Sequence, residues 1–327
     1  MKKIFALIIG LVLVLCSCSH KSNQHTASRV IMTTVVTITV YGGNSDILNG
    51  AMSLCEQYDK LFSRTVADSD VSRINSSTEC EVSADTAKLI SIGLNLSEQS
   101  DGAFDLTTLP LSELWNVNNS TTVPSHDSIT SALLSVGYKN ININENTVTT
   151  NNNARLDLGG IAKGFIADKV KEYLISNGVT KAIINLGGNI LLIGGSNDEP
   201  FTVGIQKPFA KNGTSMLNLE LSDKTAVTSG IYERYFEENG TIYHHIIDPS
   251  TGYPVQNEVA SVTVICDSSA IADGLSTACL VLGTEKGMAL AKAYGAETVF
   301  INRNGNFTLS DGLTVKSEDE IPVIILK

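Results

Sequence analysis

The sequence contains little positive charge, few aromatic residues and few prolines. Lysine and arginine number 23 against 34 aspartates and glutamates, which gives the 327 residues a formal net charge of −11. Affinity for a polyanion depends on basic side chains that neutralise phosphates, so we expect no nucleic-acid partner. Seven prolines and 26 glycines exclude a collagenous or proline-rich chain, and a hydrophobic share of 43% with 17% charged residues excludes a disordered one.

An apolar run near the start of the chain is too short to cross a membrane. Residues 4–15 contain no charged side chain, and they follow the positive pair Lys2 and Lys3. A membrane-spanning helix needs about 20 apolar residues, whereas the apolar part of a secretory signal is shorter. The pattern therefore predicts export from the cytoplasm.

A cysteine motif ends this run. Leu15-Cys16-Ser17-Cys18 resembles the lipobox of bacterial lipoproteins, whose last cysteine becomes the lipidated first residue. We expect a signal peptide over residues 1–17, lipidation of Cys18, a polar tether over 18–28 and a domain over 29–327. Lipid chains would anchor the protein to a membrane, expected to be the periplasmic side of the bacterial inner membrane. The alternative is a soluble secreted protein that ordinary signal peptidase cleaves nearby.

Four cysteines remain after this signal. Export permits disulfides, and no two of the four form the Cys-x-x-Cys pair of a metal site. Position 279 lies in an apolar helical stretch, which is typical of a buried thiol. Pairing stays open for Cys55, Cys80, Cys266 and Cys279.

No second linker and no internal repeat interrupts the sequence after Arg29. Apolar residues at helical spacing predict helices, and alternating β-branched runs predict strands. Asn239-Gly240 and Asn304-Gly305 predict tight hairpin turns. Strands in meandering runs with grouped helices indicate an α+β fold rather than a wound parallel sheet. The expected helices are 46–62, 85–99, 129–136, 161–177, 268–282 and 284–294, and the expected strands are 30–41, 182–186, 190–193, 202–206, 232–236, 241–247 and 259–265, with a further hairpin at 144–145.

Three glycine pairs stand at 159–160, 187–188 and 194–195. Glycine lets a backbone approach a ligand closely and leaves amide N–H groups free to bind an anion. The alternative is that these glycines only form tight turns. Neither GxGxxG nor a P-loop is present, so a Rossmann or Walker nucleotide site is not supported.

Asp273 and Thr277 stand four apart on an expected helix, so both project from one face. The surrounding residues are apolar, and a carboxylate buried among them needs a partner. A carboxylate and a hydroxyl together suit Mg²⁺. The alternative, an aspartate satisfied by a backbone amide or a lysine, stays open.

Two adjacent histidines occupy an expected strand. His244 and His245 must face opposite ways, so they cannot both bind one metal ion, which disfavours zinc. One of them can serve as a general base near neutral pH. The alternative is a histidine satisfied in the core or on the surface. Ser229-Gly230 nearby does not indicate a serine hydrolase, because GxSxG is absent.

Several short segments, taken in order, carry a resemblance to a known family. They are Phe62–Arg64, Ser72–Asn75, Gly102–Asp105, Pro110-Leu111, Leu114-Trp115, Asp157–Asp168, Asn185–Asn189, Thr228–Gly230 with Tyr232-Glu233, His245–Gly252, and Ala272-Asp273 with Ser276–Ala278. From about Met32 onward the chain resembles the ApbE family, the FAD:protein FMN transferases. Any single segment is weak, whereas all of them in family order form a specific match.

The resemblance implies a single α+β domain related to the T-fold, with a core of antiparallel sheet and grouped helices. It implies Mg²⁺ as cofactor and FAD as substrate, with the FMN half moved onto a threonine of an acceptor protein and AMP released. Asp273 and Thr277 then match the side chains that bind Mg²⁺, the Gly160 carbonyl is a third ligand, and His245 matches the catalytic histidine. The positions that contact FAD in the family are Met32, Thr65, Ala103, Phe104, Asp105, Asp157, Lys163 and Ile247.

Two positions depart from the family pattern. Met32-Thr33-Thr34 stands where family members often have Met-Gly-Thr, and Thr65 stands where many have a tyrosine near the flavin. The second difference affects stacking on the flavin ring rather than the chemistry. Family acceptors carry a motif close to Ser/Thr-Gly-Ala-Thr, so the expected partner is such a protein, a subunit of a membrane electron-transfer complex. This chain has no such motif of its own.

A mechanism follows from the charge. Loss of Lys2 and Lys3 with the signal would take the net charge from −11 to −13, and anionic FAD then needs local compensation. Mg²⁺, free amides at Gly159-Gly160 and Lys163 are expected to supply it. His245 would take the proton of the acceptor threonine. Two other functions use the same site: a Mg²⁺-dependent FAD pyrophosphatase that yields FMN and AMP, and a non-catalytic FAD carrier lipoprotein.

Overall fold

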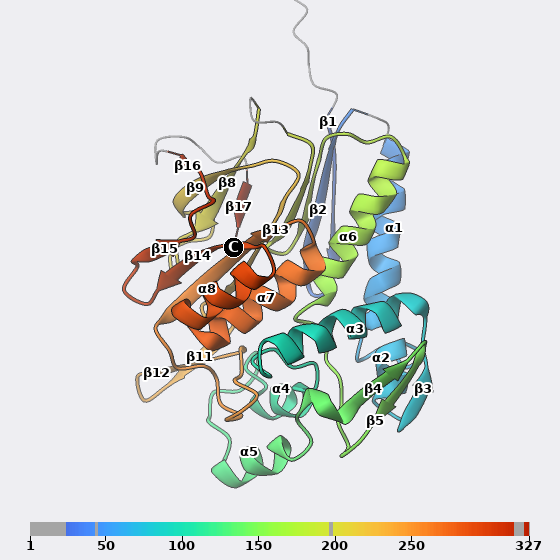
Figure 1. Ribbon diagram of the computed structural model, residues 1–327, viewed down its shortest axis with the longest axis vertical. Helices are drawn as coiled ribbons and strands as arrows, with labels where there is room; N and C mark the ends of the chain where they lie inside the picture. The colour runs from blue at the N-terminus through green and yellow to red at the C-terminus, as the bar shows by residue number, and fades with distance from the viewer. Residues whose placement is uncertain (1–23, 43–44, 196–198, 317–323, 327) are drawn as a thin grey trace, which may run out of the picture.

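Eight antiparallel strands form one sheet through the middle of the molecule (Figure 1). The computed structural model describes residues 24–42, 45–195, 199–316 and 324–326. Each strand pairs antiparallel with its neighbours. In spatial order the strands are β1 (Gln24–Ile31), β2 (Thr34–Tyr41), β6 (Ala182–Leu186), β7 (Asn189–Ile193), β10 (Thr225–Gly230), β13 (Val259–Cys266), β14 (Glu297–Asn302) and β15 (Phe307–Leu309).

Helices cover one face of this sheet (Figure 1). They are α1 (Ser45–Phe62), α6 (Ala162–Ser176), α7 (Ser269–Leu282) and α8 (Thr284–Ala293), and α3 (Ala84–Gln99) packs against α7. A smaller sheet covers the other face, in the order β16 (Val315–Lys316), β9 (Ser215–Leu221), β8 (Phe201–Gln206) and β17 (Ile324–Leu326).

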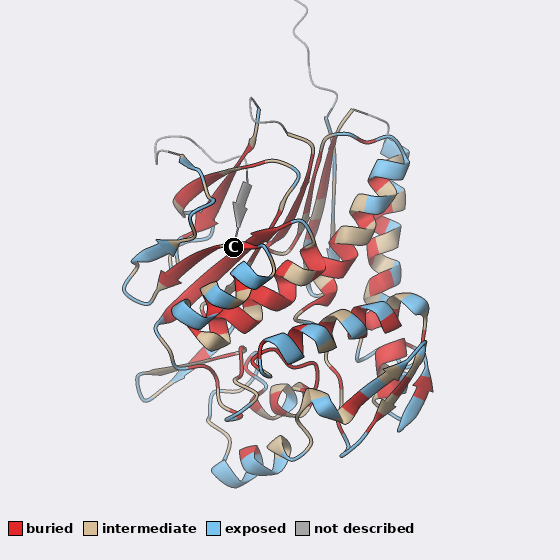
Figure 2. Ribbon diagram, viewed as in Figure 1, coloured by how far each residue is buried: buried red, intermediate tan, exposed pale blue. Residues whose placement is uncertain are grey.

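Alternation along the strands explains why the sheet is covered on both sides. On β6, Ile184 points into the core under the helices, and Ile183 points into the core under the smaller sheet. β13 repeats this pattern with Val264 and Ile265. Apolar side chains on both faces exclude water from the whole sheet, and Figure 2 shows the central strands as buried.

A third core lies beyond the end of the main sheet. Trp115 is fully buried there, stacks on Tyr243 and donates its indole N–H to the Gly252 carbonyl at 2.8 Å. The elements of this third core are α4 (Leu109–Trp115), α5 (His126–Leu133), β11 (Tyr235–Glu238) and β12 (Thr241–His244). Four other elements contribute their buried residues to the core under the helices: α2 (Asp70–Ile74), β3 (Glu79–Glu81), β4 (Ile141–Asn144) and β5 (Thr147–Thr150). A 3-10 helix (Tyr138–Asn140) precedes β4.

The α+β class in one domain is confirmed, as are the long helices and all three predicted hairpins. The expected helix 129–136 lies slightly earlier, over His126–Leu133, because Ser125 caps it. The expected strand 232–236 begins only at Tyr235. Seven strands and α-helices had no counterpart among the expected ones, and most of them are short or follow polar turns: β3, β9, β10, β16, β17, α2 and α4.

The start of the domain needs a correction. The predicted strand 30–41 is a hairpin of β1 and β2, whose turn residues Met32 and Thr33 have φ of +52° and +58°. This turn contains none of the Gly, Asn or Asp residues that usually mark it. Residues 24–28, assigned to the tether, therefore belong to the sheet. The expected signal peptide, Cys18 and the start of the tether lie outside the described residues.

The structure shows the state of the four cysteines whose pairing the sequence left open. Cys55, Cys80, Cys266 and Cys279 are buried free thiols, so no disulfide joins them. Burial raises the pKa of the Cys55 and Cys279 thiols to about 12, which keeps them protonated and unreactive. Within the described ranges, no helix has the length and apolar character needed to cross a bilayer.

Candidate active site

Helices α6 and α7 pack closely because of one glycine. A Cβ atom at Gly164 would lie 2.1 Å from the carbonyl oxygen of Ser269, so any other residue would force the helices apart. Asp168 holds the same contact: its carboxylate accepts hydrogen bonds from Ser268 Oγ (3.0 Å) and from the N–H groups of Ser269 (2.9 Å) and Ala270 (3.0 Å). These bonds fix the first turn of α7 against α6.

The contact places Lys163 against Asp273. Asp273 is 4% exposed; its Oδ1 lies 3.3 Å from Lys163 Nζ, and its Oδ2 accepts a 2.9 Å bond from the Gly164 N–H. The sequence left open a lysine or a backbone amide as the partner of this carboxylate, and the structure shows both. Each carboxylate oxygen has two acceptor positions, so the group retains capacity for another ligand.

Thr277 lies one turn further along α7, and the Gly160 backbone lies beside it. A Cβ at Gly160 would be 3.8 Å from Thr277 Oγ1 and 3.2 Å from the Phe104 ring. A carboxylate, a hydroxyl and a nearby carbonyl are hard oxygen donors, which fit Mg²⁺ and not a soft metal. No group of three or more His, Cys, Asp or Glu residues that could hold a metal occurs in the described parts of the chain. Mg²⁺ bound here would therefore complete its coordination with water or substrate oxygens.

The two histidines face opposite ways, as predicted. His244 is fully buried, and its Nε2 lies 2.8 Å from the Val255 carbonyl oxygen. The His245 ring is partly exposed, with Nδ1 3.3 Å from the Arg234 carbonyl oxygen. The surrounding protein lowers the pKa of His245 to about 3, first by desolvation and then through the charges of Arg234, His244 and Lys163. His245 is therefore neutral at pH 7, which is the form that a general base requires, although so low a pKa makes the free imidazole a weak base.

A second edge of the site consists of turns that lie near one another. Arg64 Nε lies 3.7 Å from Asp157 Oδ2, which brings the loop containing Thr65 to Asp157. The Met32 N–H donates to Asp59 on α1 at 3.2 Å. The Gly159 N–H donates to Asp157 Oδ1 at 2.9 Å. The expectation of free amides is therefore wrong for Gly159, because the preceding carboxylate already accepts its hydrogen.

The loop of Ala103, Phe104 and Asp105 packs on the same helices. Phe104 is buried against Gly160 and Gly274. Asp105 Oδ1 accepts from Thr107 N–H (2.7 Å) and Thr107 Oγ1 (2.6 Å), and Oδ2 accepts from Tyr138 N–H (2.7 Å). Burial raises the pKa of this carboxyl group. Asp105 thus orders its own turn through Thr107 and joins it to the 3-10 helix at Tyr138, and a direct contact with FAD stays a prediction.

Ile247 follows His245 by two residues and belongs to the Trp115 core. It is 7% exposed and forms an isolated bridge with Pro254. The fold thus joins the predicted residues in two groups: Gly160, Phe104, Thr277, Asp273 and Lys163 around α7, and Thr65 with Asp157 at the turns. The electrostatic effect of Lys163 on His245 links the histidine to the first group.

Comparison with known proteins decides the family. A sequence model of the ApbE family matches residues 32–300. The chain belongs to the ApbE family.

Similar ApbE proteins match most of the chain. The FAD:protein FMN transferase of Klebsiella pneumoniae (strain 342) is 35% identical over 291 residues, 86% of this chain and 90% of the relative. That of Treponema pallidum (strain Nichols) is 31% identical over 335 residues, 93% of this chain and 92% of the relative.

Solved ApbE structures agree with this fold. The ApbE protein of Thermotoga maritima superimposes with a TM-score of 0.82 at 32% identity, over 88% of this chain and 97% of that one. The flavin transferase ApbE of Vibrio cholerae gives a TM-score of 0.80 at 31% identity, with the same coverage. The resemblance stated from the sequence is confirmed.

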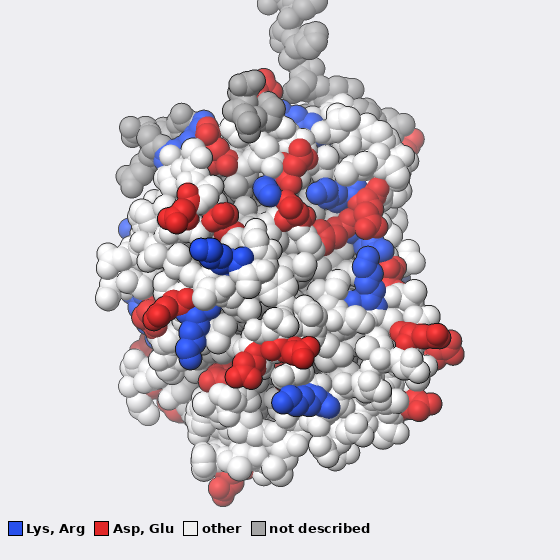
Figure 3. Space-filling view, in the orientation of Figure 1, with Lys and Arg blue, Asp and Glu red and all other residues white. Residues whose placement is uncertain are grey.

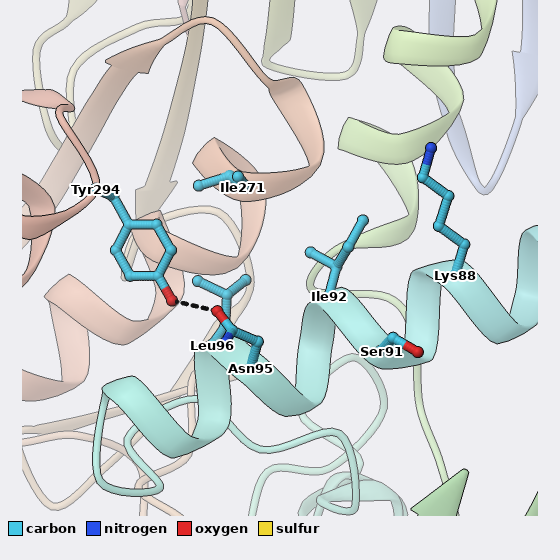
Figure 4. A pocket seen from close by; sticks show the side chains of 7 residues that line it. All are labelled: Lys88, Ser91, Ile92, Asn95, Leu96, Ile271 and Tyr294. Atoms are coloured by element: carbon cyan, nitrogen blue, oxygen red, sulfur yellow. Dashed lines mark hydrogen bonds between the residues drawn. The ribbon is translucent and has the colours of Figure 1, made fainter. Parts of the chain in front are cut away.

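This ApbE fold also has a pocket beside α3 (Figure 4). It measures about 290 Å³ between α3, α7 and α8, and the Tyr294 hydroxyl closes one side by donating to Asn95 Oδ1 at 2.9 Å. None of the predicted site residues lines it. Its lining residues are Lys88, Ser91, Ile92, Asn95, Leu96, Ile271 and Tyr294.

Charged side chains of both signs are mixed on the surface. On the face drawn in Figure 3, acidic and basic side chains alternate in small groups and form no continuous basic surface. Nucleic-acid binding needs basic residues gathered in a patch or stripe.

Sequence reasoning missed two neighbours of the ApbE site. Asp168 ends the segment Asp157–Asp168 that carries the family resemblance, but no function was predicted for it. Only tertiary packing places its carboxylate against the first turn of α7. The sequence did contain a signal for Arg234. A two-residue turn at Asn239-Gly240 pairs Glu238 with Thr241. Continuing that register four residues away from the turn places Arg234 opposite His245. The hairpin register was the available signal.

Proposed function

We propose that this chain is an FAD:protein FMN transferase that moves the FMN half of FAD onto a threonine of an acceptor protein. The transferase names of its relatives support this reaction. The observation that carries the proposal is a neutral histidine, His245, that is sensitive to the charge of Lys163, the partner of the buried Asp273. A base and an oxygen-rich cation site are the two elements that transfer of a phosphoryl group to a hydroxyl needs.

The residues divide the work between binding and proton transfer. His245 accepts the proton of the acceptor threonine as its Oγ attacks the FMN-side phosphorus of FAD. The bond from that phosphorus to the bridging oxygen breaks, and its electron pair leaves on AMP. Mg²⁺, held by Asp273, Thr277 and the Gly160 carbonyl, would supply positive charge to the pyrophosphate. The proposed FAD contacts are Met32, Thr65, Ala103, Phe104, Asp105, Asp157, Lys163 and Ile247.

Lys163 orients the metal ligand in this scheme. Its ammonium group donates to Asp273 Oδ1 and remains 27% exposed at the side chain, so it also adds positive charge where FAD is expected. Thr65 cannot stack on the flavin ring as a tyrosine would, and the flavin is therefore held from the other contacts. Phe104, buried beside Gly160, gives an apolar wall.

A direct assay separates this reaction from its two alternatives. Protein starting at Ser19 is mixed with FAD, Mg²⁺ and an acceptor domain that carries a Ser-Gly-Ala-Thr motif. In-gel fluorescence measures covalent flavin, and chromatography measures AMP. Covalent flavin together with AMP, both lost on chelation of the metal, is the expected result. AMP without labelled acceptor would favour a pyrophosphatase, and tight FAD binding without AMP would favour a carrier.

The cellular setting belongs to the same proposal. Export, lipidation at Cys18 and membrane attachment would bring the enzyme to acceptor subunits of electron-transfer complexes at the membrane. Incorporation of labelled palmitate into the full chain, lost in Cys18→Ser, tests the anchor. A full chain that incorporates no palmitate and fractionates as a soluble protein would contradict it.

A further inference from the structure

Arg234 lies beside His245 across the β11–β12 hairpin. The His245 N–H donates to the Arg234 carbonyl at 3.1 Å, and His245 Nδ1 lies 3.3 Å from the same oxygen. The register that pairs Tyr235 with His244 thus continues by one residue. Directly opposed residues of antiparallel strands project from the same face. The guanidinium of Arg234 and the imidazole of His245 therefore share one side of the hairpin.

Arg234 is exposed, and its guanidinium has no bonding partner among the described residues. Within the described residues its side chain forms no hydrogen bond and no ion pair, whereas every other arginine binds a carboxylate or a carbonyl oxygen. Lys163, the other cation close to His245, already donates to Asp273. An arginine presents five donors in a planar fork that matches phosphate oxygens. Arg234 is thus a cation next to the expected base that still lacks an anion.

The reaction requires an anion at this place. When the acceptor oxygen bonds to the FMN-side phosphorus, the electron pair of the broken bond moves onto the phosphate of AMP. We propose that Arg234 binds the pyrophosphate of FAD beside His245 and stabilises the AMP phosphate as it leaves. This inference rests on the proposed function and adds a catalytic residue to it. Arg234 would also supply positive charge to the pyrophosphate, which the Gly159 N–H does not, because that N–H already donates to Asp157.

A comparison of two ligands tests the binding part. Riboflavin has the flavin ring but no phosphate, so a residue that binds the pyrophosphate affects FAD and not riboflavin. For Arg234→Gln we expect about tenfold weaker FAD binding with unchanged riboflavin binding, measured by flavin fluorescence. Lys181→Gln is the matched control, because it removes one positive charge from an exposed pair with Glu199 at the start of β6. Equal FAD affinity in Arg234→Gln and wild type would overturn the inference.

Kinetics with the same acceptor domain tests the catalytic part. An arginine that stabilises departing phosphate charge contributes strongly to turnover, and we expect kcat to fall about 100-fold or more in Arg234→Gln. The KM for the acceptor should stay unchanged. Arg234→Lys should recover FAD binding but little of the rate, because an ammonium lacks the planar fork.

Three outcomes separate the possible failures. A rise confined to the acceptor KM would place Arg234 against the acceptor and overturn the inference. Normal kcat in Arg234→Gln, with an active wild type, would overturn it while the proposed function stands. A wild type that yields neither AMP nor labelled acceptor contradicts the proposed function, and the comparison of FAD with riboflavin then still decides whether Arg234 binds the pyrophosphate.

Discussion

The site has two sides that are held in different ways. On the α6–α7 side, Asp273 and Asp168 are both extensively hydrogen-bonded, and the close approach at Gly164 leaves no space for adjustment. On the β11–β12 side, a two-stranded hairpin presents a partly exposed His245 and the exposed Arg234. The first arrangement suits a site that must hold a cation in a fixed place. The second leaves room for a large partner to reach the base.

This difference predicts where changes disturb the fold and where they disturb only the chemistry. Buried polar groups are costly to leave without a partner, whereas exposed groups lose little when they are replaced. Substitutions on the α6–α7 side should therefore affect stability and activity together. Substitutions on the hairpin side should affect activity alone.

The largest effect is expected for Asp273→Asn. The amide keeps the shape of the side chain but removes the charge that pairs with Lys163 and that we propose binds Mg²⁺, so transfer should fall by about 1,000-fold or more. Calorimetric titration with Mg²⁺ should show loss of metal binding, and circular dichroism should show a retained fold with a lower thermal unfolding midpoint. Transfer at the wild-type rate would remove Asp273 from the metal site.

The next largest effect is expected for His245→Gln. Loss of a positioned general base lowers the rate by about 100-fold or more, while FAD affinity and thermal stability should not change. Rates of AMP release and FAD titrations measure the two quantities. A variant that turns over normally would show that another group takes the proton.

The pH profile sharpens this result for the unmodified protein. Protein surroundings lower the pKa of His245 to about 3, so the base form persists as the pH falls well below the ordinary histidine value of 6.5. Titration of His245 should therefore cause no change in the transfer rate between about pH 8 and pH 5. A loss of rate with a midpoint near 6.5 would contradict this assignment.

Asp168→Asn should have a moderate effect on both stability and metal binding. Its carboxylate accepts three bonds from the first turn of α7, and an amide can accept only part of them. We expect the free energy of unfolding to fall by about 1–3 kcal/mol and Mg²⁺ to bind more weakly. Urea unfolding and Mg²⁺ titration measure these changes. Weaker metal binding without any loss of stability would mean that Asp168 acts in another way.

The smallest effect is expected for Arg64→Gln. The ion pair with Asp157 is long, at 3.7 Å, and the Arg64 side chain is 42% exposed. Pairs of this kind stabilise proteins by about 0–1 kcal/mol. The unfolding midpoint should therefore stay nearly constant, and FAD affinity should change by less than about threefold. A large loss of FAD binding would show that Arg64 contacts the substrate directly.

Local patterns were sufficient for much of the fold. The helix at 46–62 and the strands around 182–193 follow from apolar periodicity, and Asn239-Gly240 marks the β11–β12 turn. The β1–β2 hairpin was missed because its turn is formed by Met32 and Thr33 with positive φ. Neither residue type favours that conformation, so the sequence contains no local signal for it.

For the site, local patterns predicted which side chains share a face but did not predict their hydrogen-bond partners. The spacing of Asp273 and Thr277 placed them on one helix face, and the adjacent histidines had to face opposite ways. The partner of Asp273 could not be named, because Lys163 is separated from it by 110 positions. Gly159 was expected to offer a free amide, yet Asp157 accepts its hydrogen.

The sequence by itself determined which residue types are present, where the long helices and most of the central strands form, and the family to which the chain belongs. Those properties depend on interactions between residues near one another in the chain, or on motifs read in order. Only the tertiary structure decided that Asp168 fixes α7 and that Asp105 accepts a hydrogen bond from the distant Tyr138 N–H. Such choices depend on which segments pack together, because a polar group finds its partner only after folding has removed water from both.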